Sequence, residues 1–134
     1  MKVKAIIERG KDGFFSVYMD NDDFKFGLNG QGNTVEEAKA DFLVAHDEMK
    51  SLFLDENKEF PELVFEYEYD VDSLLNYYAG ILSKSGLEKI TGVNQKQLWH
   101  YSSGKRKPSK QTVLKIESGL RKFGEELSLL HLVD

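Results

Sequence analysis

The chain has 134 residues, a net charge of −5 at neutral pH and no cysteine. Without cysteine it cannot form disulfides, thiolate metal sites or a cysteine nucleophile, and this agrees with a reducing compartment. No run approaches the ~18 apolar residues that a membrane helix needs, and the first residues lack the apolar core of a signal peptide, so we expect a cytoplasmic protein that does not enter a membrane.

The charge is distributed unevenly along the chain. Residues 1–83 carry eight basic and eighteen acidic side chains, a net charge of −10, whereas residues 84–122 carry ten basic and two acidic side chains, a net charge of +8. The two parts should prefer partners of opposite charge. With the patterns described below, this asymmetry predicts two domains, residues 1–70 and residues 71–134.

The first domain has the pattern of a small α+β fold. Residues 3–7 and 14–19 are strand-like and flank a turn-prone segment, which predicts a hairpin, and Phe24–Leu28 resembles a third strand that ends at Gly30 and Gly32. A fourth strand is expected over Leu63–Tyr69, where apolar and acidic residues alternate. The predicted order is four strands with one helix before the last.

The helix of this domain has the clearest signals. Thr34 is a favourable N-cap and Glu37 follows three residues later, which is the pattern of a capping box. Apolar residues then recur at steps of three and four, so that one stripe of the helix can cover a sheet face. The stripe consists of Val35, Ala38, Phe42, Ala45, Met49 and Leu52.

Candidate chemistry in the first domain is sparse. The glycines before the helix are better explained by a loop than by a phosphate cradle, since two glutamates in the first helical turn would repel an anion. The acidic segment Asp20–Asp23 favours a solvated turn over a cation site, and His46 is expected to be a surface residue without a metal partner. The strand carboxylates Glu66 and Glu68 lie on one strand only, which disfavours a two-metal nuclease. We therefore expect no enzyme activity, no cofactor and no metal site.

The second domain has the pattern of an all-α unit. A helix is expected after Asp72, with Leu74, Leu75, Tyr78, Ile81 and Leu82 on its apolar side. Ser85 and Glu88 predict a capping box that opens a short helix ending at Gly92, and Asn94 predicts the N-cap of another short helix that runs to Gly104. Two short helices joined by a tight turn are the helix-turn-helix arrangement.

The second short helix has an outward face suited to reading DNA. Leu98 and Tyr101 are expected to face the core, and this leaves five residues toward the outside: Gln95, Lys96, Trp99, His100 and Ser103. Gln95 and Lys96 lie at the end that enters a major groove, where Gln can pair with adenine and Lys with guanine, and His100 lies one turn further on. Trp99 either packs on a thymine methyl or is a partly buried structural anchor, and the second interpretation is favoured.

A basic loop follows this helix. Lys105, Arg106 and Lys107 precede Pro108 and Ser109, a predicted N-cap, so the loop is expected to clamp the DNA backbone. A solvated charge run without a partner is the alternative. The full predicted DNA-binding set is Asn94, Gln95, Lys96, Gln97, His100, Ser103, Lys105, Arg106, Lys107, Ser109 and Lys110.

The last predicted helix is amphipathic and leads into an apolar end. Thr112, Val113, Ile116, Leu120 and Phe123 share one side, and they are followed by a surplus of apolar residues that either close the core or form a dimer seam. Because duplex sites are usually read by symmetric dimers, we expect a homodimer or tetramer. The surplus consists of Leu127, Leu129, Leu130, Leu132 and Val133.

Two segments resemble known families. The string from Gly86-Leu87 through Thr91-Gly92-Val93-Asn94, with Leu98, Tyr101 and Ser103–Pro108, resembles a lambda-repressor-like (Xre-type) helix-turn-helix, although Glu88 stands where such domains have a small residue. Residues 1–69, with the string Gly32–Ala38 and the final strand, resemble the N-terminal domain of HicB antitoxins, although Asp20–Asp23 replaces a proline-containing loop common there.

The resemblance to the HicB family implies a partial RNase H-like first domain without its active site. It also implies a HicA-like mRNA-cleaving toxin as partner and repression of the shared operon by binding of operator DNA. The acidic balance of residues 1–83 agrees with a basic toxin partner. The alternative function is a stand-alone Xre-type transcription regulator whose first domain senses a ligand or mediates oligomerisation.

Overall fold

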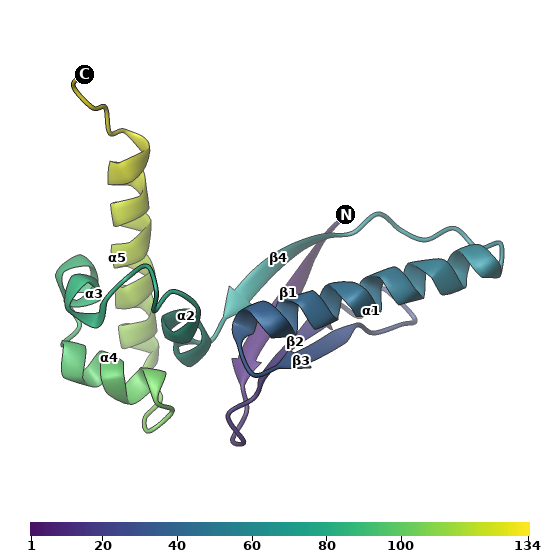
Figure 1. Cartoon of the computed structure of the whole chain (residues 1–134), viewed down its shortest axis with the longest axis horizontal. Coiled ribbons are helices and arrows are strands. Elements are labelled where there is room, and N and C mark those ends of the chain that lie inside the picture. Colours follow the sequence, from purple (N-terminus) through teal and green to yellow (C-terminus); the bar gives the residue numbers. More distant parts are fainter. The chain divides into compact units, whose positions relative to one another are not determined.

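The computed structural model describes residues 1–134 and has an α+β fold with a four-stranded mixed sheet and five helices. The chain divides into two compact units, Met1–Tyr77 and Tyr78–Asp134 (Figure 1). The predicted boundary lies after residue 70, so the two divisions differ by helix α2 (Val71–Tyr77), which contacts strands of the first unit. The α+β class is confirmed.

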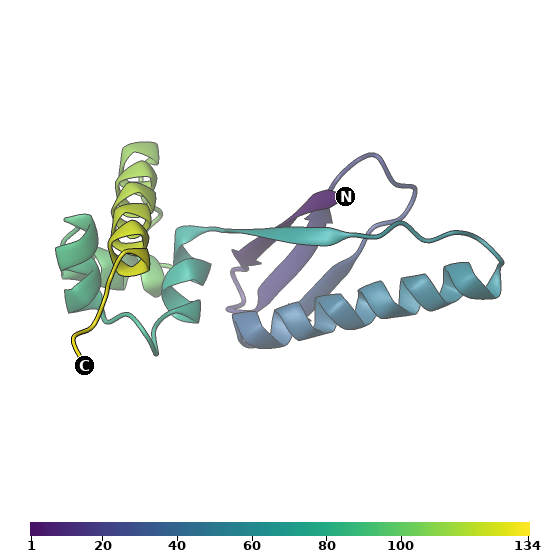
Figure 2. The same ribbon diagram turned by 90° about the horizontal axis from the view of Figure 1, so that it is seen from above.

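The sheet of the first unit has the strand order β3-β2-β1-β4. Strands β1 (Lys2–Arg9) and β2 (Phe15–Asp20) form the predicted antiparallel hairpin, and β3 (Asn29–Gly32) extends it on one side. On the other side β4 (Val64–Tyr69) pairs parallel with β1. Helix α1 (Val35–Asp55) connects β3 to β4 and lies along one face of the sheet (Figure 2).

The core of this unit lies between α1 and that face. Alternate residues of β1 and β2 point toward the helix, as the period of two in a strand requires. The predicted apolar stripe of α1 faces them from Val35 to Met49, but Leu52, which was assigned to the stripe, is 50% exposed. The fully buried positions are Val3, Ala5, Ile7, Val17, Val35, Ala38 and Phe42.

The third strand lies later in the chain than predicted. Phe24–Leu28 is not a strand; Phe26 instead stacks on other aromatic rings, at 5.3 Å from Phe24 and 5.5 Å from Phe60. The strand that forms is β3, and it contains Gly30. A Cβ atom at Gly30 would lie 2.2 Å from the amide nitrogen of Phe42, so α1 approaches the sheet too closely for any other residue. The loop interpretation of this glycine was therefore wrong.

The predicted N-terminus of α1 is confirmed. The amide of Glu37 donates to the hydroxyl of Thr34 at 3.1 Å, and the Glu37 carboxylate accepts from the amide of Asn33 at 2.9 Å. Further along the helix, His46 is not the surface residue that was expected. Its ring packs edge-on against Phe60, with the ring centres 5.4 Å apart, and its side chain is only 19% exposed.

Helix α2 is held to the first unit by two charged contacts. Arg9 lies 3.2 Å from the carboxylate of Asp72, and burial raises the pKa of Asp72 although the arginine opposes this shift. The Lys39 ammonium of α1 donates to the hydroxyl of Tyr69 at 2.7 Å and lies 4.4 Å from the ring centre of Tyr77. Cation–π contacts of this kind contribute about 0.5–1 kcal/mol at exposed sites, so the end of α2 is fixed by more than chain connectivity.

The second unit consists of α3 (Lys84–Thr91), α4 (Gln95–Ser102) and α5 (Lys110–Ser128) around a small core. Helix α5 approaches α3 closely, because a Cβ atom at Gly119 would lie 2.6 Å from the carbonyl oxygen of Ile90. The buried hydrophobic residues are Leu87, Val93, Leu98, Tyr101 and Ile116.

Three predicted boundaries in this part of the chain need correction. The helix after Asp72 ends at Tyr77, and Ile81, which was assigned to its apolar side, is 77% exposed. The N-cap of α3 is Ser83, whose hydroxyl accepts from the amide of Gly86, so Ser85 lies inside the helix. Helix α4 ends at Ser102 and not at Gly104.

The apolar residues at the C-terminal end do not close the core. All five remain exposed, at 50–99% of their surface. Of the two expectations for this segment, core closure is therefore wrong, and the dimer seam stays a prediction. The residues are Leu127, Leu129, Leu130, Leu132 and Val133.

Candidate nucleic-acid interface

The connection between α3 and α4 is a rigid three-residue turn. Gly92 ends α3 with a φ of 76°, a left-handed conformation that glycine adopts without strain, and its amide donates to the carbonyl of Glu88. The hydroxyl of Thr91 accepts from the amide of Val93, and the Val93 side chain is buried. The turn therefore fixes the direction in which α4 leaves α3.

Two side chains cap the start of α4. The Asn94 side chain accepts a hydrogen bond from the amide of Lys96 at 2.8 Å, as predicted for an N-cap. The Glu88 carboxylate accepts from the amide of Gln95 at 3.1 Å, so this residue of α3 caps the next helix and not its own. The sequence prediction missed this role because the contact spans seven residues and depends on the angle between the two helices.

A third side chain covers the turn from helix α5. The ammonium of Lys115 donates to the carbonyl oxygen of Gly92 at 3.3 Å. The positive charge of Lys115 therefore lies beside the C-terminal end of α3, where it also compensates the partial negative charge of that helix end. All three helices of the unit therefore contribute to the position of α4.

Helix α4 has one buried side and one solvent side. Leu98 is fully buried and Tyr101 is 8% exposed, as predicted. The exposed residues include Lys96 and Trp99 on the opposite side. Trp99 is 55% exposed, so the expectation that it is a partly buried anchor was wrong: its side chain lies on the solvent side of the helix, away from the buried Leu98 and Tyr101.

His100 is the partly buried member of the predicted reading set. Its Nδ1 atom is buried and has no hydrogen-bond partner, and its ring meets that of Trp99 edge-on at 5.5 Å. Partial burial and the positive charges of Lys105, Arg106 and Lys96 lower the pKa of His100 below its ordinary 6.5. The imidazole is thus biased toward its neutral form, in which one ring nitrogen donates and the other accepts.

The basic loop returns to the end of α4. Gly104 has a φ of 77°, and the amides of Lys105 and Arg106 both donate to the carbonyl of His100, at 3.0 and 3.3 Å. Lys105, Arg106 and Lys107 are exposed, and none of them forms a salt bridge. Three positive charges are therefore free to meet an anion beside the solvent side of α4.

Helix α5 begins directly after this loop. The hydroxyl of Ser109 accepts from the amide of Thr112 at 3.2 Å, which confirms Ser109 as the N-cap, and Lys110 is exposed at the first helical position. The predicted set therefore lies within one continuous segment. Asn94 and Ser109 act as helix caps, His100 is partly buried, and the other members are exposed.

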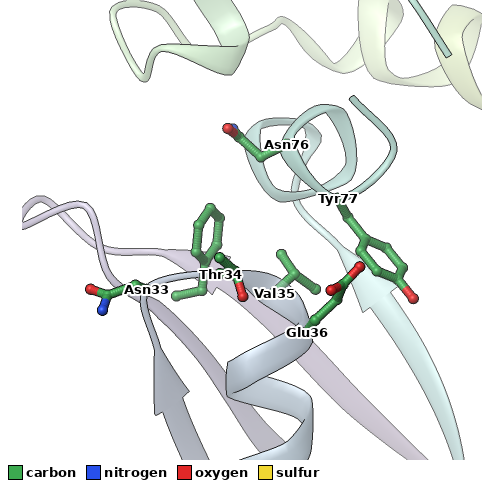
Figure 3. A pocket seen from close by; sticks show the side chains of 7 residues that line it. Asn33, Thr34, Val35, Glu36, Asn76 and Tyr77 are labelled. Carbon is green, nitrogen blue, oxygen red and sulfur yellow. The ribbon is translucent and has the colours of Figure 1, made fainter. Parts of the chain in front are cut away.

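The surface of the first unit is hollowed at the start of α1 and, more shallowly, along its outer side. A cavity of about 230 Å³ lies at the start of α1, where Figure 3 shows the lining side chains coming from α1, α2 and the loop between β3 and α1. A shallow groove of about 420 Å³ follows the outer side of α1 and is lined by Val44, Asp47, Glu48, Ser51, Leu52 and Asp55. Val44 and Leu52 are 52% and 50% exposed. All six residues come from α1 itself, so the groove is an open face of this helix that presents two exposed apolar side chains beside three carboxylates.

No group of three or more His, Cys, Asp or Glu side chains is placed to hold a metal ion. The strand carboxylates considered for a nuclease lie near lysines of β1, with Glu66 at 3.5 Å from Lys2 and Glu68 at 3.2 Å from Lys4. No helix has the length and apolarity to cross a membrane.

No protein-family model, curated protein or solved structure matches the chain.

Proposed function

We propose that the protein is a DNA-binding antitoxin that represses its own operon and neutralises a HicA-like mRNA-cleaving toxin. The observation that carries the DNA-binding part is the solvent side of α4, where Lys96 and Trp99 are exposed and the unpaired cations of residues 105–107 follow. An α-helix fits the major groove, and its first residues approach the base edges when its N-terminal end enters the groove.

In this proposal the residues have two kinds of role. Gln95 and Lys96 read base edges at the start of α4, with His100 one turn further along. Lys105, Arg106 and the N-terminus of α5 bind backbone phosphates, because unpaired cations and free helix amides both attract anions. Phosphate contacts supply affinity that depends on salt, and base contacts supply sequence preference.

Dimerisation would place two such helices on successive turns of the duplex. We assign this role to the exposed apolar end of the chain, Leu127–Val133, with a second copy of the same segment as its occupant. Apolar residues exposed together mark interaction sites more often than scattered ones do. A tetramer would follow if the first unit also self-associates.

The toxin-binding part of the proposal concerns the outer groove of α1. A toxin that cleaves mRNA has to bind RNA, so we expect its binding surface to be basic. The groove presents the carboxylates of Asp47, Glu48 and Asp55, with two exposed apolar residues, Val44 and Leu52, beside them. Opposite charges accelerate association, and the exposed Val44 and Leu52 provide apolar side chains that the toxin would bury at the centre of the contact. The resemblance of residues 1–69 to HicB antitoxins supports a toxin as the partner, and the choice of this surface rests on its charge and exposed apolar residues.

Co-expression with the adjacent genes tests this part. A small basic protein that is toxic alone should co-purify with the wild type, and the double variant Asp47→Lys and Glu48→Lys should lose it. The matched control is Glu66→Lys, a charge reversal on β4, which should retain it. Loss in neither variant would remove the assignment of the groove, and recovery of the wild type alone would remove the antitoxin function.

The second candidate is a stand-alone Xre-type regulator with a sensing first domain. The cavity of about 230 Å³ at the start of α1 favours it, because polar and apolar side chains line the cavity together; its volume is below the roughly 300 Å³ of ordinary ligand pockets, so the ligand would be a very small molecule. In that case an intracellular small molecule should change DNA affinity without any protein partner. Electrophoretic mobility of a DNA complex, measured with and without a metabolite extract, separates the two candidates.

A further inference from the structure

Trp99 is the single tryptophan of the chain, and the fold does not use it as a core residue. Its side chain is 55% exposed, whereas Leu98 beside it is fully buried. On a helix, Trp99 lies three residues after Lys96 and four residues before Ser103, so these three share one strip of the solvent side. The indole is thus at the centre of the strip proposed to meet DNA.

The surroundings of Trp99 decide what it meets. A large exposed aromatic ring gains free energy when a partner covers it, since burial of apolar surface contributes about 25 cal/mol per Å². Lys96 on the same strip and the unpaired cations of residues 105–107 favour a polyanion as that partner. A protein partner that covered Trp99 would have to accept these positive charges at the edge of the contact. For a protein partner we have already assigned another surface, the groove on α1.

The chemistry of the major groove narrows the target further. Its base edges present hydrogen-bond donors and acceptors, which Gln95 and Lys96 can match, and one apolar group, the C5-methyl of thymine. An indole has a large apolar face and one N–H donor, so it matches the methyl and not a polar edge. Trp99 lies four residues beyond Gln95, a rise of about 6 Å along the helix, which reaches past the base pair that Gln95 contacts.

We propose that Trp99 is a specificity-determining residue that recognises a thymine by packing against its C5-methyl group. The proposal rests on the proposed DNA-binding function and deepens it. The methyl is then removed from water on both sides, and its loss should weaken binding about fourfold, which corresponds to ~0.8 kcal/mol for a buried methyl-sized group.

The experiment begins with selection of bound sequences from a random duplex library by the full-length protein. In the selected site each thymine is replaced singly by deoxyuridine, which differs only in lacking the methyl. Affinities are measured by anisotropy of dye-labelled duplex for the wild type and for Trp99→Ala. At one thymine the wild type should lose about fourfold on methyl removal, and Trp99→Ala should bind both duplexes equally there.

Two controls make the result specific. Phe14→Ala removes another exposed aromatic residue, 47% exposed and located in the first unit, and should keep the full wild-type sensitivity to the methyl. Trp99→Phe keeps an apolar ring and should retain part of that sensitivity. Because Trp99 is the single tryptophan, its own fluorescence should change on binding the thymine duplex and change less with the deoxyuridine duplex.

The outcomes separate the two proposals. If labelled duplex binds neither the wild type nor the variants, the DNA-binding function fails. If duplex binds but Trp99→Ala loses as much as the wild type at every deoxyuridine substitution, the DNA-binding function stands and the role of Trp99 is overturned.

Discussion

Two glycines of helix α5 should respond to the same substitution with opposite sign. At Gly124 a Cβ atom would meet nothing within 4 Å, so Gly124→Ala changes only helix propensity and should stabilise the second unit by about 0.5–1 kcal/mol. At Gly119 the Cβ atom would lie 2.6 Å from the carbonyl oxygen of Ile90 and 2.8 Å from the Cα atom of Thr91, whereas ordinary contact begins near 3.4 Å.

The magnitude at Gly119 follows from which atoms are in the way. Both are backbone atoms of α3, so no side chain can rotate aside and the two helices must separate. Overpacking of this kind costs typically 1–3 kcal/mol, which exceeds the gain in helix propensity. Gly119→Ala should therefore destabilise the unit by about 1–2 kcal/mol net, a decrease of several degrees in the melting temperature for a unit of this size.

Thermal unfolding followed by circular dichroism measures both variants in the full chain. We expect a higher transition temperature for Gly124→Ala and a lower one for Gly119→Ala. Gly30→Ala in the first unit serves as the comparison, because it should lower only the transition of that unit. Equal stabilisation by both α5 substitutions would contradict the close packing of α5 on α3 and the placement of α4 that depends on it.

Three further predictions concern α4 and its surroundings. Glu88→Ala removes a cap from the amide of Gln95 and should lower the free energy of unfolding by about 1 kcal/mol, measured by urea denaturation, while Glu88→Gln keeps the acceptor and should lose less. An NMR titration should give a pKa for His100 below its ordinary 6.5, and this pKa should rise in Lys105→Ala. Between the folded-state pKa and 6.5 the unfolded state binds more protons than the folded state, so this histidine should lower the free energy of unfolding as the pH falls through that interval. Arg106→Ala should weaken binding to all DNA sequences and reduce the salt slope by about one, whereas Gln95→Ala should relax sequence preference. The same loss pattern for both would refute the division of roles, and an unshifted histidine would refute the local charge argument.

Signals that are local in the chain predicted the fold well. The caps Thr34, Asn94 and Ser109 all accept the expected amide hydrogen bonds, because an N-cap contact spans only two or three residues. The buried pair Leu98 and Tyr101 also followed from the period of the helix. For these elements the sequence contains the whole physical cause.

The errors arose where long-range packing decides the structure. The segment Phe24–Leu28 has strand-like composition, but the ring of Phe26 packs on rings from α1 and from the loop after it. The strand forms instead at the following segment, where Gly30 has no side chain and α1 can therefore approach the sheet closely. The choice of Ser83 over Ser85 as the N-cap of α3 has another cause, because serine is a preferred N-cap residue at either position. Pattern alone could not choose between two serines two residues apart.

The candidate site divides in the same way. The exposed polar residues of α4 could be predicted, because the core side was fixed by Leu98. The outward position of Trp99 followed from the same pattern, but the preference for a partly buried anchor was wrong, because it relied on the general tendency of large aromatic residues to be buried. The contact of Glu88 with Gln95 could not be predicted, since it depends on the angle between two helices. The helical wheel did contain the signal for Trp99, which lies on the side away from Leu98 and Tyr101.

The contact of Glu88 with the start of α4 also gives that helix a direction. A fixed negative charge lies at its first amide and three unpaired positive charges lie beyond its last turn, which is the order that stabilises a helix against its own dipole. Near a polyanion the three positive charges attract the C-terminal end of α4, whereas at its first turn the charge of Glu88 is offset by the exposed Lys96. The C-terminal end would then meet the DNA backbone first, and the first turn would settle on the base edges afterwards.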